Sequence, residues 1–421
     1  MVTQLLRRPP AVITTLAVGA AVTVSTIPSL LPRSAPVQGL LTGALVLTAL
    51  ALVGLGRALV RRLRRGHGEW LGRARGSADP GVRWLVLAGT VCTTSVAAWL
   101  AQHFLTGWTA ALGMPGPTPA YWLVAGLWAG LLIALMVILV VVARRIVGAH
   151  WRGTARPLAV VVLAGATVTT AAAAPVDLLG VIRKDLSPGH VMLVDSPLGA
   201  LRSFALVDEA PTPGAGAELA VKRMAAAGGL ERAAIVVALP TGSGWVNGAA
   251  VAGMEAELGG DVAVVSAQYS DLPSWWHFLL DREPAHESAR ALLREVVELV
   301  GQLPVDERPD VYVYGESLGA MAGQAALADL DPGAVCGVVW SGSPAAGLAG
   351  HPRERSLANP DDPVVRWTPA TLWEHPQEWP TLWLPGVSYL STTLDLAGSL
   401  RPDPGHGHQY GAEQDWALPR C

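Results

Sequence analysis

The sequence predicts a two-part chain: an α-helical transmembrane bundle of about five spans at residues 1–176, then an α/β domain with a mainly parallel, doubly wound sheet at residues 177–421. Charged residues make up only 15% of the chain and mean hydropathy is +0.38, whereas a soluble domain carries about 25% charged residues. Residues 1–176 carry 15 Arg against 2 acidic residues, and the remainder carries 15 basic against 31 acidic residues. The second part alternates short β-branched runs with helical stretches, which is typical of a parallel α/β sheet.

Five apolar segments in the first part approach the roughly 20 residues that a helix needs to cross a bilayer. They are residues 11–31, 37–60, 84–102, 120–143 and 157–175. The sequence has no Asp or Glu within them, which argues against a transporter or channel, because ion and proton pathways need ionisable groups in the membrane. A cleaved signal peptide is the alternative for the first segment, but that apolar stretch is longer than a usual signal-peptide core.

The arginines predict the orientation of these segments. Eight Arg lie at the end of the second segment or between it and the third, and four lie between the fourth and fifth, whereas the first connection holds only Arg33 and the third holds none. The positive-inside rule then predicts a multi-pass cell-membrane protein with a cytoplasmic amino terminus and an extracytoplasmic second part. If residues 157–175 do not cross the membrane, the second part is cytoplasmic. We interpret the Arg-rich loop as this topology signal and predict the lipid bilayer, not nucleic acid, as the partner.

The elements of the second part follow from its apolar runs. Four of these runs are continuous, as in strands that are covered on both faces of a sheet. Strands are predicted at residues 234–239, 262–267, 311–314 and 335–340. Helices are predicted between or after them, at residues 248–258, 286–303 and 318–330. Their alternation is the order of a parallel, doubly wound sheet.

The strongest chemical signal is the pentapeptide Gly315-Glu316-Ser317-Leu318-Gly319, which follows the strand VYVY and precedes a helix. A G-x-S-x-G sequence in that context is typical of a nucleophile elbow, in which a strained turn presents the serine hydroxyl above the sheet. The flanking glycines avoid clashes with neighbouring elements. We therefore predict Ser317 as a nucleophile, against the alternative of a serine in a structural turn.

An oxyanion hole needs two backbone donors near this turn. The amide at the start of the following helix, that of Leu318, is one candidate. The strand at residues 234–239 runs into a Gly-rich loop, residues 240–245, and there Ser243 or Gly244 is the other candidate. A turn without this role is the alternative for the loop.

A serine nucleophile needs a base and an orienting acid, which follow it in the order Ser, acid, His in this kind of fold. The histidines after Ser317 are His351, His375, His406 and His408. The last two lie on a Gly-rich loop near the carboxyl end, where the base is expected; both remain candidates, with His408 slightly favoured. Asp362 is the best-placed acid. The fallback acids are Asp361, Asp395 and Asp403.

The sequence predicts neither a metal nor a cofactor. His406 and His408 lack a clear carboxylate partner for a metal site, and no phosphate loop or dinucleotide fingerprint is present. Cys92, Cys336 and Cys421 have neither zinc-site spacing nor the pattern of a disulfide framework. We expect them to be small buried side chains and a free end.

Several segments together resemble a family of bacterial integral-membrane α/β-hydrolases, which are predicted serine hydrolases with an N-terminal multi-span domain. The similar segments are residues 240–246, 268–275, 315–319, 362–365 and 405–408, together with the five-span first part. The resemblance implies an α/β-hydrolase-like catalytic domain with a Ser–Asp–His triad: Ser317, Asp362 and either His406 or His408. One feature departs from this pattern. Residues 348–360 are polar and interrupted by prolines, so the sequence predicts no strand before Asp362.

These observations favour a membrane-anchored serine hydrolase that cleaves an ester-type bond of a small acyl or lipid-like substrate, through an acyl-enzyme on Ser317. An acyltransferase on the same site is an alternative. A non-catalytic binding module that keeps the fold is another, and the missing strand favours it. The sequence leaves the oligomeric state open.

Overall fold

A computed structural model of the chain describes residues 10–66, 79–147, 190–272, 274–344, 350–376, 379 and 382–421. The chain divides into two compact units. The first comprises Met1–Val176 with Ala370–Gly398, and the second comprises Asp177–Pro369 with Ser399–Cys421. The segment Ala370–Gly398, expected in the second domain, thus belongs to the first unit, and the chain leaves the second unit and later returns to it.

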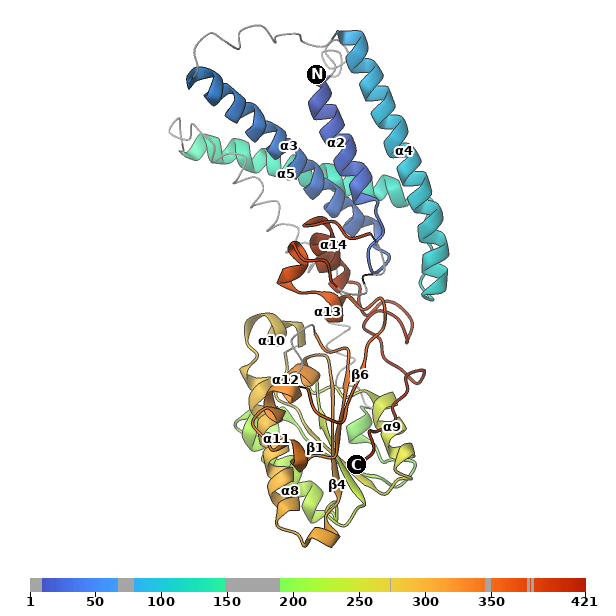
Figure 1. The fold of residues 1–421 in the computed structure, drawn as a ribbon, viewed down its shortest axis with the longest axis vertical. Coiled ribbons are helices and arrows are strands. Elements are labelled where there is room, and N and C mark those ends of the chain that lie inside the picture. Colours follow the sequence, from blue (N-terminus) through green and yellow to red (C-terminus); the bar gives the residue numbers. More distant parts are fainter. Residues whose placement is uncertain are drawn as a thin grey trace. The chain divides into compact units, whose positions relative to one another are not determined.

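The first unit is helical (Figure 1). Its helices are α2 (Val12–Ser25), α3 (Ala35–Gly66), α4 (Pro80–Ala111), α5 (Tyr121–Val147) and α14 (Val387–Leu396). Three of them are long and apolar enough to cross a membrane, over Ala35–Arg62, Pro80–Ala111 and Tyr121–Val141. Large apolar side chains on α4 and α5 are exposed, among them Leu85, Trp99 and Leu123, as expected for helices that contact lipid.

The expectation of five spans is only partly met. Helix α2 has 14 residues, which makes it about 21 Å long, too short for a bilayer core of about 30 Å. The predicted first span, residues 11–31, is wrong in its last six residues, because the helix ends at Ser25 and the following residues form a loop. The predicted fifth span, residues 157–175, lies outside the described residues.

The loop between α2 and α3 surrounds the carboxylate of Asp395, which belongs to α14. The Ser29 hydroxyl donates a hydrogen bond to Asp395 Oδ2, and so do the amides of Leu30 (3.0 Å) and Leu31 (3.3 Å). Arg33 Nε lies 3.3 Å from Oδ1, and both side chains of this ion pair are almost fully buried. The backbone amides of Leu30 and Leu31 have no helical acceptor, because α2 has already ended. The carboxylate of Asp395, more than 360 residues later in the chain, accepts their hydrogen bonds instead.

Apolar packing holds α14 against α3 beside this ion pair. Leu394 is 2% exposed and lies in a buried cluster with Val37, Leu40 and Leu41 of α3. Together with the Asp395 contacts, this packing makes α14 an integral part of the first unit, although it lies between Asp362 and His408 in the sequence.

The second unit is built on a six-stranded, all-parallel sheet with strand order β1-β3-β2-β4-β5-β6. The strands are β1 (Leu201–Ala205), β2 (Ala234–Leu239), β3 (Val262–Ala267), β4 (Asp310–Glu316), β5 (Gly337–Ser341) and β6 (Glu354–Leu357). Every residue of β2, β3 and β5 is buried, as the continuous apolar runs predicted. The prediction of a parallel, doubly wound sheet is confirmed.

Helices cover both faces of the sheet (Figure 1). Helices α8 (Pro213–Ala226), α11 (Glu283–Gly301) and α12 (Leu318–Leu327) bury their apolar residues against one face. Helix α9 (Gly248–Glu257) packs on the other face, where the carboxyl-terminal tail adds Tyr410 and Trp416. Two short helices, α10 (Ser274–Leu280) and α13 (Pro363–Arg366), lie in the connections that follow β3 and β6.

The prediction that no strand precedes Asp362 is wrong. Strand β6 pairs in parallel with β5, with Val339 opposite Arg355 and Ser341 opposite Leu357. Its residues, ERSL, are half-buried or exposed because β6 is the edge of the sheet. An edge strand need not be an apolar run, so its sequence carries no strong strand signal.

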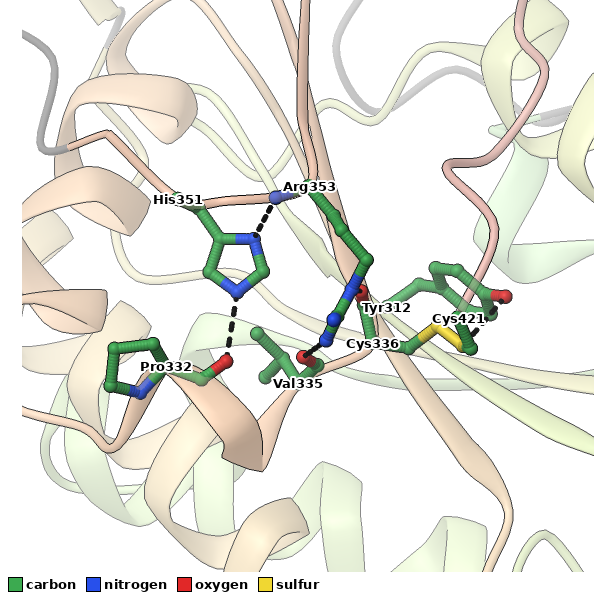
Figure 2. The surroundings of a disulfide bond; sticks show 7 residues. All are labelled: Tyr312, Pro332, Val335, Cys336, His351, Arg353 and Cys421. Atoms are coloured by element: carbon green, nitrogen blue, oxygen red, sulfur yellow. Dashed lines mark hydrogen bonds between the residues drawn. A yellow bond between two sulfur atoms is a disulfide. The ribbon is translucent and has the colours of Figure 1, made fainter.

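The cysteines also differ from expectation. Cys336, just before β5, forms a disulfide with Cys421, the last residue, and their Cα atoms are 5.1 Å apart. Figure 2 shows the bond beside Tyr312, whose hydroxyl lies 3.3 Å from Cys421 Sγ, and beside Arg353, which donates hydrogen bonds to the carbonyls of Val335 and Cys336. The disulfide ties the tail to the sheet. Cys92 is a free cysteine, exposed on α4.

Candidate active site

Ser317 lies between β4 and α12 in a strained turn. Its φ is 53° and its ψ is −119°, and it is the one non-glycine residue with positive φ in the part of the chain that the structure describes. Such a conformation is costly for a residue with a side chain. Strain at a strand-to-helix serine is the property that defines a nucleophile elbow.

The two glycines of the pentapeptide are required by close packing around this turn. A Cβ at Gly315 would lie 2.7 Å from the amide nitrogen of Ala320, and one at Gly319 would lie 2.2 Å from the carbonyl oxygen of Leu239 at the end of β2. Neither contact is sterically possible. The tight approach brings the turn against the loop that follows β2.

The predicted oxyanion donors lie beside the turn. Leu318 is the first residue of α12, and amides in the first turn of a helix lack intrahelical acceptors. Ser243 is buried in the loop after β2. Gly244 donates its amide to the carbonyl of Thr241 (2.8 Å), so this amide belongs to the local turn and is not available as an oxyanion donor. The roles of Leu318 and Ser243 stay predictions.

Asp362 is fully buried at the end of the loop after β6. Its Oδ1 accepts a hydrogen bond from the amide of Val364 (2.8 Å), which caps α13. Its Oδ2 accepts one from His408 Nδ1 (2.7 Å) and one from the Tyr410 hydroxyl (2.6 Å). The carboxylate is thus held by two hydrogen bonds besides the one to the imidazole, and it orients His408.

The geometry distinguishes the two candidate histidines. His408 is 11% exposed in its side chain and contacts the buried Asp362, whereas His406 is 40% exposed and lies 3.4 Å from Asp361. Asn359 holds the backbone on both sides of His408, because its Nδ2 donates to the carbonyls of Gly407 (3.0 Å) and Gln409 (2.9 Å). The pair that carries the geometry of a catalytic dyad is Asp362–His408.

Two contacts connect this pair to Ser317 through the end of β5. The amide of Ser317 donates to the carbonyl of Ser341 (2.9 Å). The next residue, Gly342, faces the histidine so closely that a Cβ there would lie 2.6 Å from His408 Cε1 and 2.6 Å from Tyr410 Cε2. The nucleophile turn and the imidazole therefore lie next to the same strand end.

The surroundings of His408 set its protonation. Burial lowers the pKa of the imidazole, but the Asp362 carboxylate and, more weakly, Glu316 raise it, and the net effect is a pKa above the ordinary 6.5. Burial and the neighbouring Asp362 raise the pKa of Tyr410 as well, so this phenol is a neutral donor to Asp362.

Three residues of this site were not predicted as functional. Tyr410 donates to the acid, Glu316 is a buried carboxyl next to the nucleophile, and Asn247 donates from Nδ2 to both Glu316 Oε2 (2.8 Å) and the carbonyl of Tyr410 (2.8 Å). The signals that could have found them are a charged residue inside G-x-S-x-G and a tyrosine two residues after the base.

The other candidates lie elsewhere. His351 is structural, because its Nδ1 accepts from the amide of Arg353 (3.2 Å) and its Nε2 contacts the carbonyl of Pro332 (3.0 Å), as Figure 2 shows. His375 stacks edge-on against Trp383 in the first unit. Of the fallback acids, Asp361 faces His406, Asp395 is held by the α2–α3 loop, and Asp403 is exposed.

One set of potential metal ligands occurs among the described residues. Asp310, Cys336 and Cys421 bring ligand atoms within 4.8 Å of one another. The disulfide engages both sulfur atoms, and a metal needs thiolates, so these residues do not fit a metal ion.

Comparisons with known proteins indicate the family of the chain. A family described as "Alpha/beta-hydrolase family" matches residues 201–351, and its N-terminal part, described as "Alpha/beta-hydrolase family N-terminus", matches residues 27–189. No curated protein matches the chain. A similar solved structure is that of Trichoderma reesei cutinase in complex with a C11Y4 phosphonate inhibitor, at 15% identity and a TM-score of 0.25, over 44% of this chain and 87% of the cutinase. That likeness is too slight to bear on substrate or activity.

The two family matches cover most of the helical part and the sheet through β5, including the Ser317 turn. The chain belongs to this alpha/beta-hydrolase family.

Proposed function

We propose that the chain is a membrane-anchored serine hydrolase that cleaves an ester-type bond of an acyl or lipid-like substrate. The observation that carries the proposal is the buried Asp362–His408 hydrogen bond (2.7 Å), next to the strand end that also holds the strained Ser317 turn. Strand β6 ends five residues before Asp362. The expected absence of such a strand was the reason to favour a non-catalytic binding module, and that reason no longer applies.

The reaction follows from these groups. His408 takes the proton of the Ser317 hydroxyl while the oxygen attacks the carbonyl carbon of the substrate, and the Asp362 carboxylate stabilises the imidazolium that forms. The amides of Leu318 and Ser243 donate to the oxyanion of the tetrahedral intermediate. His408 then protonates the leaving alcohol or thiol. Water hydrolyses the acyl-enzyme by the same steps and regenerates Ser317.

Labelling with a fluorophosphonate probe tests the nucleophile. Wild-type protein in detergent should be labelled, Ser317→Ala should not, and Ser356→Ala, at an exposed serine of β6, should be labelled like wild type. Equal labelling of Ser317→Ala, or no labelling of folded wild type, would contradict the proposal.

We also propose that the second unit lies outside the cell membrane. The Cys336–Cys421 disulfide supports this side, because disulfides form in oxidising compartments and are rare in the cytosol. The distribution of arginines supports it independently. Arg33 is the one arginine in the connection between the first and second predicted spans. Its charge is paired with the buried Asp395, so it does not argue against an outer position of this connection.

The ion pair adds an argument from chain continuity. Residues 370–398 continue directly into the second unit at both ends, and their Asp395 contacts the α2–α3 loop. The Arg-rich carboxyl end of α3 is predicted to be cytoplasmic, so this loop is on the outer side. Helices α3, α4 and α5 then return the chain to the cytoplasmic side by residue 147.

An impermeant maleimide tests the orientation in intact cells. In a Cys92→Ser background, Val305→Cys introduces a thiol at a residue that is 79% exposed in the second unit, and we expect it to be labelled without permeabilisation. Arg61→Cys, on the predicted cytoplasmic end of α3, should be labelled only after permeabilisation. The reverse pattern would place the hydrolase unit in the cytoplasm.

A further inference from the structure

Glu316 is a carboxyl group enclosed in the core beside the candidate nucleophile. It is the last residue of β4 and is 4% exposed. Its Oε2 accepts hydrogen bonds from Asn247 Nδ2 (2.8 Å), the Tyr314 hydroxyl (3.0 Å) and the Ser341 hydroxyl (3.0 Å). All three donors are neutral, so the side chain is an acceptor held by hydrogen bonds alone.

A buried carboxylate without a cationic partner is costly to desolvate. The amide oxygen of a glutamine could accept the same hydrogen bonds at lower cost. A glutamate at this position therefore indicates a role that a glutamine could not fill, and the group whose positive charge favours its ionised form is the imidazole of His408.

Asn247 connects Glu316 to the tail that carries His408. Its Oδ1 caps α9 by accepting from the amide of Ala249 (2.9 Å), and its Nδ2 donates to both Glu316 and the carbonyl of Tyr410. The Tyr410 hydroxyl in turn donates to Asp362. One contiguous set of buried hydrogen bonds thus runs from the residue before the nucleophile to the acid of the dyad.

We infer that Glu316 is a positioning residue of the active site, which holds the His408 tail through Asn247 and stabilises, as a buried anion, the imidazolium formed when His408 accepts the Ser317 proton. This inference rests on the proposed function. Glu316 acts beside Asp362 as a second carboxylate for the same imidazole, and it does not contact the reacting atoms.

The groups that face His408 come from three places: Asp362 after β6, Glu316 at the end of β4, and Tyr410 in the tail. Tyr410 is neutral, so the two carboxylates are the anions of the set. The pKa of Glu316 lies above its ordinary value, because burial raises it by more than His408 and the three hydrogen-bond donors lower it. Proton uptake by His408 therefore favours the ionised form of Glu316, and the ionised form favours proton uptake.

The test is the rate of fluorophosphonate labelling of the full-length protein as a function of pH. Labelling requires neutral His408, so its rate falls as the pH drops through the pKa of the imidazole. Glu316→Gln removes one anion and should shift this fall to lower pH by about one unit. It should also slow labelling at the plateau about tenfold. Glu307→Gln, an equal charge change at an exposed residue, should change neither.

A second variant tests the hydrogen bonds themselves. Asn247→Ser keeps a side-chain cap for α9 but removes the donor to the Tyr410 carbonyl and one donor to Glu316, so it should slow labelling and also move the fall to lower pH, by less than Glu316→Gln does. Should Glu316→Gln fail to fold, Tyr314→Phe removes one donor from the carboxylate and should shift the profile in the same direction by a smaller amount.

If the pH profile of labelling does not move in Glu316→Gln, the inference is wrong and Glu316 has only a packing role. The same holds for Tyr314→Phe where that variant replaces Glu316→Gln. Complete absence of labelling in folded wild type is a different result, because it overturns the proposed function and this inference with it.

Discussion

Removal of the Cys336–Cys421 disulfide should destabilise the hydrolase unit strongly. Cys421→Ser frees the end of a tail that crosses one face of the sheet and carries His408, Tyr410 and Trp416. The cross-link joins residues 85 apart in sequence. Without it, the unfolded chain regains the conformations that the closed loop excludes.

The size of the effect follows from that loop. The chain-entropy relation for a loop of about 85 residues yields roughly 4.6 kcal/mol at 25 °C, and measured disulfides typically contribute about 2–4 kcal/mol. For a domain of about 200 residues each kcal/mol corresponds to roughly 2–4 °C. We therefore expect the Tm of the hydrolase unit to fall by roughly 5–15 °C.

Differential scanning fluorimetry in detergent measures this change, with and without reductant. Cys336→Ser, Cys421→Ser and the double variant should all lose the same amount, because each breaks the same bond. Reductant should lower the Tm of wild type to their level and leave the variants unchanged. Cys92→Ser is the matched control, since it removes an exposed, unpaired thiol.

Thiol counting supplies the result that would refute the reasoning. Wild type purified from membranes without reductant and denatured should react with one maleimide, at Cys92. Three reactive thiols would show that the bond does not form in the cell, which would also remove one support for the extracytoplasmic side. Single variants no less stable than Cys92→Ser would show that the tail is held by its other contacts.

Three further predictions concern single contacts. Asp362→Asn should slow turnover on the order of 10⁴-fold. The acid limb of kcat/KM lies above pH 6.5 in wild type because the pKa of His408 is raised, and the variant should move this limb to lower pH. A pH–rate profile measures both changes. Gly342→Ala forces a methyl group against His408 and Tyr410 and should abolish most fluorophosphonate labelling, whereas Gly301→Ala, with open space around it, should not. Asp395→Ala leaves the buried Arg33 unpaired and should destabilise the first unit by about 3–5 kcal/mol, measured as urea-dependent proteolysis against the exposed-residue control Asp403→Ala.

The parts of the fold that the sequence predicted are those with local signals. Continuous apolar runs identified β2, β3, β4 and β5, because strands covered on both faces must be apolar throughout. The Ser317 turn was predictable for a similar reason: glycines at fixed offsets after a strand are needed wherever backbones approach within contact distance. The preference for His408 agreed with the geometry, although its spacing alone could not exclude His406.

The missed elements lie at the edges of the sheet. Strands β1 and β6 each have one neighbour, and the half-exposed ERSL of β6 has no apolar pattern to detect. The disulfide was missed because 85 residues separate its cysteines, and no local spacing encodes a bond formed by tertiary structure. Likewise, nothing near Asp395 in the sequence indicates that its donors are residues 29–33.

The membership of Ala370–Gly398 in the first unit has a consequence for any attempt to isolate the hydrolase. A fragment of residues 190–421 would keep α14 but lose the loop that donates four hydrogen bonds to Asp395 and the α3 side chains that cover Leu394. We expect it to aggregate, because it exposes the apolar face of α14 that packs against α3.

Replacement of residues 370–398 by a Gly/Ser linker of about 12 residues should restore a soluble monomer. The linker has only a short distance to bridge between Pro369 and Ser399. Pro369 is seven residues after Asp362, which contacts His408. The carbonyl of Ser399 accepts a hydrogen bond from the amide of the same His408 (2.7 Å). Such a linker spans up to about 40 Å when extended, which exceeds the reach that these contacts require. Size-exclusion chromatography and fluorophosphonate labelling measure the outcome. A soluble, monomeric fragment with α14 intact would contradict the assignment of this segment to the first unit. A soluble linker variant that the probe does not label would instead mean that the segment itself aligns Asp362 with His408.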